Sequence, residues 1–223
     1  MANSYGLVIF DCDGVLIDSE ILSGSVMVDE LARLGITIDI SVFFSRMVGR
    51  SFEQAMATVH ELTGKSVPSG FKDSFRLSLL ARFEHDLKPI AGIVDLLSSL
   101  RVPVCVATSS DPLRAARSLE VTGLSRFFTD RVFTASMVPN GKPAPDLFLH
   151  AAQVMSVEPA RAIVIEDSAF GLMAAKAAGM TAWHFTGGGH FKGGYQVASE
   201  IMRDQSFSNM ADLLTAARQL RIA

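Results

Sequence analysis

Acidic residues near the N-terminus have the types and spacing of a reactive carboxylate pair. Asp11 and Asp13 are separated by one residue, and Gly14 follows them directly. Carboxylates at this spacing can serve as a nucleophile, as a proton donor and acceptor, or as ligands of a hard divalent cation. A glycine beside them lets the backbone turn close to a bound group. This segment is therefore the first candidate for the reactive part of a site.

Polar residues of complementary chemistry stand at three other places in the chain. Thr108 and Ser109 offer hydroxyl groups, and Lys142 offers a cation at the expected start of a helix. Glu166 and Asp167 add a second pair of carboxylates. These residues can act together only if the fold brings four distant segments to one place.

The elements that would position these residues alternate between strands and helices. The acidic and hydroxyl groups follow continuous apolar runs, which is the pattern of strands buried on both faces. The predicted strands are residues 7–10, 102–107, 131–135, 162–165 and 181–185. Helical patterns at residues 113–119 and 171–178 lie between strands, and Gly179 is the expected C-cap of the second. The alternation predicts an α/β fold with a doubly wound parallel sheet, which binds ligands at the carboxyl ends of its strands.

One long interval lacks the strand pattern. Helical periodicity recurs instead at residues 21–34, 52–62 and 71–83. Glycines and a proline separate these helices. The prediction is a two-part organisation, in which residues 1–16 and 88–223 form the α/β core and residues 17–87 form a helical cap over the sheet.

The four sets of polar residues together resemble the motifs of the haloacid dehalogenase-like (HAD) superfamily. In chain order, the matching segments read FDCDGVLIDSE, VATSSD, GKPAPD and VIEDSAFGLMAAKAAG. Each motif alone is weak, but the ordered set spans nearly the whole chain and is specific. A helical insert directly after the first motif is similar to the subfamily of beta-phosphoglucomutases and sugar-phosphate phosphatases. The resemblance implies a Rossmann-like core and a phosphatase that acts on a small phosphorylated metabolite.

The resemblance also implies catalytic roles. Asp11 would attack phosphorus and form an aspartyl phosphate, and Asp13 would act as general acid and base with a suitably raised pKa. Thr108 and the amide of Ser109 would hold the phosphoryl oxygens. Lys142 would offset the negative charge of the phosphate and of the nucleophile.

Mg²⁺ is the cofactor that the resemblance implies. Its expected ligands are Asp11, the backbone carbonyl of Asp13, Asp167 and Glu166, and either member of the acidic pair could bind through water. Gly14 is expected to let the backbone approach the metal and the phosphate closely.

Simpler interpretations exist for single residues. Thr108 and Ser168 could cap the helices that follow them, since hydroxyl side chains are common at helix N-caps. Lys142 could be a solvated loop charge, and Glu166 could serve a helix dipole. Taken jointly and in order, these residues favour the catalytic interpretation.

Substrate choice is expected to reside in the cap and the loops that face it. The segment 47–51 resembles a cap segment that presents an arginine to a distal anionic group, so Arg50 is the candidate specificity residue, with a surface helix-start charge as the alternative. The loop at residues 186–190 could line the mouth of the site, although His190 itself is expected to be exposed. Asp18 and Glu20 could cap a helix or order the hinge of the cap.

Departures from the family pattern bear on other functions. Dehalogenating members lack the second aspartate of the first motif, so Asp13 argues against that chemistry. Beta-phosphoglucomutases carry a histidine in the helix that enters the cap, and residues 21–26 contain none, so a phosphomutase is the lesser alternative. A phospho-acceptor receiver domain would be shorter, without an insert, and would carry its acceptor aspartate later. A binding protein with an inactive site is disfavoured by the complete set. No residue identifies the substrate, and the resemblance suggests a sugar phosphate or a sugar-acid phosphate such as 6-phosphogluconate.

Composition bears on partners and compartment. The 20 basic and 23 acidic side chains nearly balance, and no basic run occurs, so nucleic acid is not an expected partner. Neither a signal peptide nor a spanning helix is expected, which predicts a soluble, cytoplasmic protein without membrane association. Cys12 and Cys105 lie in strand-like stretches and are expected to be free, buried thiols. A monomer is the expected state.

Overall fold

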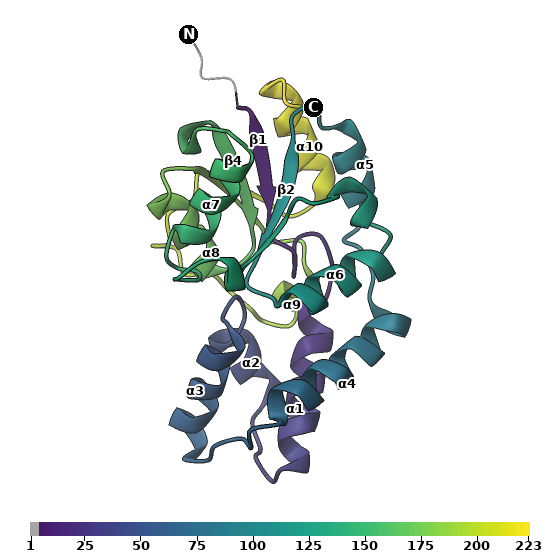
Figure 1. Ribbon diagram of the computed structural model, residues 1–223, viewed down its shortest axis with the longest axis vertical. Coiled ribbons are helices and arrows are strands. Elements are labelled where there is room, and N and C mark those ends of the chain that lie inside the picture. The colour runs from purple at the N-terminus through teal and green to yellow at the C-terminus, as the bar shows by residue number, and fades with distance from the viewer. Residues whose placement is uncertain (1–4) are drawn as a thin grey trace.

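The computed structural model describes residues 5–223, and its centre is one six-stranded parallel sheet (Figure 1). The strands are β1 (Leu7–Phe10), β2 (Val104–Thr108), β3 (Val132–Thr134), β4 (Ala162–Glu166), β5 (Thr181–Phe185) and β6 (Gln205–Phe207). They lie in the order β3-β2-β1-β4-β5-β6, and all neighbours are parallel. The predicted doubly wound sheet is confirmed, and strand order reverses at β1, where such sheets bind ligands.

Alternate residues of β1 pack against helices on opposite faces of the sheet. Leu7 and Ile9 belong to the core under α7 (Asp146–Val154) and α8 (Ala169–Ala177), whereas Val8 and Phe10 belong to the core on the other face. The helices on the two faces are α5 (Ile93–Ser99), α6 (Pro112–Val121), α7 (Asp146–Val154), α8 (Ala169–Ala177) and α10 (Met210–Gln219). Because both faces of β1 are covered, every side chain of this strand is apolar. The first polar side chain is that of Asp11, which follows the strand at the point where the chain leaves the sheet.

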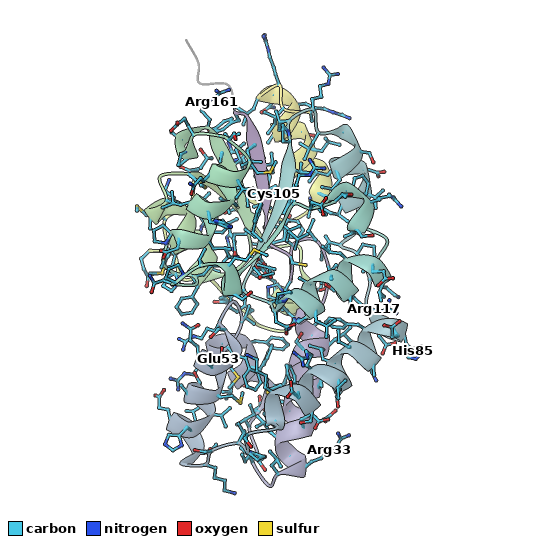
Figure 2. All side chains as sticks on the ribbon, viewed as in Figure 1. Arg33, Glu53, His85, Cys105, Arg117 and Arg161 are labelled. Atoms are coloured by element: carbon cyan, nitrogen blue, oxygen red, sulfur yellow. The ribbon has the colours of Figure 1, made fainter. Side chains whose placement is uncertain are left out.

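Four of the five helices between β1 and β2 form a separate group at the end of the molecule opposite the C-terminus (Figure 1). They are α1 (Glu20–Arg33), α2 (Ile40–Arg46), α3 (Phe52–Thr63) and α4 (Phe71–Asp86). Two adjacent chain segments join this group to the sheet, since the amide of Asp18 donates to the carbonyl of Lys88 at 3.0 Å. Arg117 of α6 also links the sheet domain to this group, because it makes two contacts of 2.6 Å with Glu84 of α4. Figure 2 shows this arginine near the end of α4.

The structure departs from the predicted elements in a few places. α2 and the edge strand β6 were not expected, and two of the three residues of β6 are exposed, so it lacks a buried apolar run. The remaining short elements are α9 (Gly189–Lys192) and 3₁₀ turns at Ser125–Phe127, Ala135–Met137 and Pro159–Arg161. Lys142 lies in the turn before α7 and does not itself open that helix. Gly179 follows α8 with φ of +72°, which fits its expected capping role.

Both cysteines are buried and free, as expected. Cys105 lies inside the sheet in Figure 2, between residues of the core under α7 and α8. Among residues 5–223, no helix combines the length and apolar character needed to cross a membrane.

Candidate active site

The carboxyl ends of β1, β2 and β4 bring the predicted reactive residues to one cavity of about 440 Å³. Asp11 directly follows β1, Thr108 ends β2, and Glu166 ends β4. The cavity lies between the sheet and the helical group, and both contribute residues to its lining. The other predicted site residues that line it are Asp13, Arg50, Ser109, Lys142 and Asp167.

Lys142 lies buried between two carboxylates. Its ammonium group donates to Oδ1 of Asp11 at 2.5 Å, to Oε1 of Glu166 at 2.6 Å and to the carbonyl of Ala107 at 3.0 Å. These contacts use all three of its N–H donors. Burial alone would lower the pKa of Lys142, but the negative charges of Asp11 and Glu166 outweigh burial and raise this pKa. The interpretation of this residue as a solvated loop charge is wrong, because only 4% of it is exposed.

The two members of the acidic pair have different surroundings. Besides Lys142, Glu166 accepts from the amide and the hydroxyl of Ser168 through Oε2, at 2.8 and 2.9 Å. Oδ2 of Asp167 is buried and has no hydrogen-bond partner among the described residues. Ser168 also accepts from the amide of Gly171 at 3.1 Å, which confirms its expected role as the cap of α8.

The acidic cluster fits a hard divalent cation. Oxygen atoms of Asp11, Glu166 and Asp167 lie within 4.8 Å of one another. Burial and the neighbouring carboxylates raise the pKa of Asp11 well above its ordinary value, although Lys142 lowers it, and burial and Glu166 do the same for Asp167. Carboxylate oxygens are preferred ligands of Mg²⁺, and the carboxylate of Asp167, whose Oδ2 makes no hydrogen bond with a described residue, keeps lone pairs for an ion.

Position 14 requires glycine, because Asp167 approaches its backbone closely. Its φ is +81°, and a Cβ atom at this position would collide with Oδ2 of Asp167. The group that approaches this glycine is thus a carboxylate of the acidic cluster, and the expected approach to a metal and a phosphate stays a prediction.

Asp13 lies in a different electrostatic setting from the one expected. Its Oδ1 accepts from Arg114 and from Ser19, both at 2.6 Å, and its Oδ2 accepts from Ser110 at 2.6 Å. Burial acts to raise the pKa of Asp13, but the guanidinium and the hydroxyl groups outweigh it and lower the pKa below its ordinary value. The expected raised pKa is wrong for this arrangement, because the sequence did not reveal the cation.

Arg114 is the main site residue that sequence reasoning missed. It reaches from α6 to Asp13 and also donates to the hydroxyl of Ser23 on α1 at 3.0 Å. A signal was present, because Arg114 lies in the first turn of α6, where the helix dipole disfavours a cation. Asp111 is the N-cap of this helix, so Thr108 does not cap it.

Comparisons with known proteins agree with the geometry. The family model for haloacid dehalogenase-like hydrolases matches residues 5–179. The chain belongs to this family. The 6-phosphogluconate phosphatase of Escherichia coli (strain K12) is 29% identical over 186 residues, which are 83% of this chain and 84% of that protein. The fructose-1-phosphate phosphatase of the same strain is 32% identical over 184 residues, which are 82% of this chain and 97% of that protein.

A solved structure is similar over almost its full length. It is a HAD family hydrolase from Deinococcus radiodurans R1 with bound phosphate and sodium. It is 28% identical, covers 99% of this chain and 98% of its own, and superposes with a TM-score of 0.77. Because our chain belongs to this family and has these phosphatases as relatives, it is a phosphoric monoester hydrolase.

Arg50 of the hydrolase faces the cavity from the loop before α3. Its guanidinium lies 4.8 Å from the ring centre of Phe170, and its Nε is buried without a hydrogen-bond partner in the described part of the chain. Gly49 has φ of +76°, and a Cβ there would lie 2.5 Å from Cβ of Ser168, so this loop contacts the core closely. Ser51 caps α3, which leaves Arg50 outside the helix.

The segment after β5 of the hydrolase lies elsewhere than expected. His190 is fully buried, so the expectation of an exposed loop residue is wrong. Residues 186–190 are not among those that line the cavity, and His190 lies next to Asp167 instead. The amide of Gly189 donates to Oδ1 of Asp18 at 2.8 Å, so this carboxylate connects the segment before α1 to the start of α9. The N-cap of α1 is Ser19, which leaves Asp18 outside the capping position.

The raised pKa of Glu20 predicts a measurable dependence of protein stability on pH. It is buried beside the cavity, and burial followed by the charge of Asp13 raises its pKa from 4.5 to about 8. The folded state thus keeps a proton that the unfolded state releases, so the stabilisation is full below pH 4.5 and is lost as the pH rises through about 8. Glutamine cannot titrate. Glu20→Gln should therefore gain stability relative to wild type over this range, on the order of a few kcal/mol.

Urea unfolding in metal-free buffer at several pH values measures this difference. Titrating groups that do not interact with Glu20 are common to both proteins and cancel in the comparison. A difference in unfolding free energy that stays constant with pH would contradict the raised pKa of Glu20.

Proposed function

We propose that this HAD hydrolase cleaves a small phosphorylated metabolite in a Mg²⁺-dependent reaction with Asp11 as nucleophile. The observation that carries the proposal is the buried contact of 2.5 Å between Lys142 and Asp11, beside an acidic pair in which Oδ2 of Asp167 makes no hydrogen bond with a described residue. A lysine in this position holds one Asp11 oxygen and leaves the other to face a substrate. The family membership and the phosphatases among the relatives support the reaction class.

We further propose that Asp11, Asp167 and the backbone carbonyl of Asp13 would hold the Mg²⁺ ion. Glu166 has both oxygens engaged by Lys142 and Ser168, so its proposed role is to orient these groups, with contact to the ion through water. When bound, Mg²⁺ neutralises charge on the phosphate and helps to align it with the nucleophile.

The proposed reaction proceeds in two transfers. In the first, a carboxylate oxygen of Asp11 attacks phosphorus, the ester P–O bond breaks, and Asp13 gives a proton to the leaving oxygen. In the second, Asp13 takes a proton from water, whose oxygen attacks the same phosphorus and releases inorganic phosphate and free Asp11. The hydroxyl of Thr108 and the amide of Ser109 donate to the phosphoryl oxygens. Before it can act as the acid, Asp13 must give up its contact with Arg114, which lowers its pKa, and take up a proton from solvent.

Residues 17–87 are proposed to act as a cap domain that selects the substrate. Arg50 would bind a distal anionic group, since its Nε is buried without a partner and its side chain lines the cavity. The proposed substrates are sugar phosphates or sugar-acid phosphates, as the names of the two E. coli relatives suggest.

The proposed activity can be tested with the purified protein and a panel of phosphorylated metabolites. Phosphate release is measured with Mg²⁺ and with a chelator in excess. Release that depends on Mg²⁺ is expected for several sugar phosphates. Equal rates with and without the chelator, or no release from any compound, would contradict the proposal.

Arg50→Ala is expected to change selectivity and leave the chemical step intact. A charge-assisted contact contributes about 1.5 to 3 kcal/mol, so kcat/KM should fall about 10- to 100-fold for substrates with a second anionic group. Substrates without such a group should lose little. The matched control is Arg46→Ala, which removes an arginine of the same cap that pairs with exposed Glu61 at 2.8 Å. Equal losses for both substrate classes would show that Arg50 does not read the distal group.

A further inference from the structure

A buried histidine, His190, lies next to Asp167 and is not among the groups that the proposed reaction uses. Nε2 of His190 lies 3.1 Å from Oδ2 of Asp167. The histidine has no exposed surface, and neither ring nitrogen makes an aligned hydrogen bond with any described residue. A buried polar ring without aligned partners is costly, so its presence at this point calls for an explanation.

The surrounding backbone leaves room for the imidazole. A Cβ on Gly188 would lie 2.7 Å from Cε1 of His190 and 2.9 Å from the carbonyl oxygen of Gly14. A Cβ on Gly14 would lie 2.9 Å from the same ring carbon. Glycines from two loops that are distant in sequence therefore form a slot for this ring, and the glycine run after β5 is part of it.

Contacts on several sides hold His190 in the slot. Phe191 and Tyr195 pack on the ring with centre distances of 4.4 and 5.2 Å. The carbonyl of His190 accepts from the amide of Tyr195 at 3.1 Å, and the hydroxyl of Tyr195 accepts from the amide of Ala169 at 3.1 Å. Figure 1 shows α9, which carries this histidine, between the sheet and α1. The ring is thus fixed relative to the start of α8, where Asp167 lies.

We propose that His190 is a positioning residue, whose Nε2–H donates to Oδ2 of Asp167 and orients that carboxylate toward a divalent cation. The inference rests on the proposed function, in which Asp167 is a ligand of Mg²⁺. His190 itself lies outside the cluster of oxygen atoms formed by Asp11, Glu166 and Asp167. Mg²⁺ prefers oxygen ligands, so a nitrogen group suits an outer position. Groups that hydrogen-bond a ligating carboxylate fix its orientation, and their loss lowers metal affinity about 10- to 100-fold.

The test compares His190→Phe, which keeps a ring and loses the donor, with His190→Gln, whose amide can still donate to Asp167. Lys192→Ala, at an exposed position of the same helix, is the matched control. Titration calorimetry with Mg²⁺ on the substrate-free protein gives the dissociation constant, and the rise in melting temperature with Mg²⁺ gives a second measure. His190→Phe should bind Mg²⁺ about 10- to 100-fold more weakly. His190→Gln should regain most of the affinity, and Lys192→Ala should match wild type.

Kinetics separate positioning from a general loss of structure. In His190→Phe, the Mg²⁺ concentration for half-maximal activity should rise, and the substrate KM at saturating Mg²⁺ should stay unchanged. A folded His190→Phe protein with wild-type affinity for Mg²⁺ would overturn the inference. If that variant does not fold, His190→Asn replaces it, since its shorter amide cannot span the gap, and wild-type affinity in both amide variants would overturn the inference. A wild-type protein that binds no Mg²⁺ would instead contradict the proposed function.

Discussion

Asp11→Asn is expected to lower the rate of phosphate release by about 10⁴-fold or more, because an amide cannot attack phosphorus as a carboxylate does. The substitution also removes a proposed Mg²⁺ ligand and one of the two carboxylates that contact Lys142. Aspartate and asparagine have similar shapes, so the packing at the end of β1 should be kept. The loss of activity should therefore appear in kcat while the protein stays folded. The measurement is single-turnover and steady-state phosphate release at saturating Mg²⁺.

A direct test of the nucleophile follows the phosphoryl group itself. Acid quench after mixing with substrate carrying radiolabelled phosphate should leave label on wild type and none on Asp11→Asn. The matched control is Asp29→Asn, which neutralises an exposed carboxylate on α1 and should retain wild-type activity. If Asp11→Asn kept a tenth of the wild-type rate, another group would have to be the nucleophile.

The positions of the reactive residues could be predicted because they depend on short-range signals. Continuous apolar runs identify strands buried on both faces, and the ends of parallel strands meet at one edge of a sheet. Asp11, Thr108 and Glu166 each stand at such an end, so their convergence followed from the strand pattern. Lys142 does not end a strand, and only its place within the ordered set of motifs indicated its role.

The partners of these residues could not be predicted, because they come from distant segments whose approach depends on packing. Arg114 and Asp13 are 101 residues apart, and the guanidinium reverses the expected direction of the pKa shift of Asp13. Gly188 belongs to the segment that was expected to be a loop at the mouth of the site, yet it makes room for the buried ring of His190. Glycine permits close approach as well as flexibility, and sequence alone does not distinguish the two uses.

Lys142→Met is expected to destabilise the protein by about 3 to 5 kcal/mol in metal-free buffer, because it leaves buried carboxylates without their cation. The lysine side chain is 1% exposed and pairs with Asp11 and Glu166 at 2.5 and 2.6 Å. Methionine fills much of the volume, so the loss reports charge rather than a cavity. Activity should fall about 10²- to 10³-fold as well, because a cation that steadies the nucleophile is lost.

The matched control is Lys176→Met, which breaks an ion pair with Asp204 at 3.0 Å whose side chains are 27% and 41% exposed. Such partly exposed pairs contribute at most about 1 kcal/mol, so urea unfolding should separate the two variants clearly. Lower pH should narrow the stability deficit of Lys142→Met, because Asp11, whose pKa burial raises, can take up a proton in place of the missing cation. A deficit as small as that of Lys176→Met would mean that Asp11 is already protonated in the wild-type fold. Lys142 would then not hold Asp11 as the anion that attack on phosphorus requires.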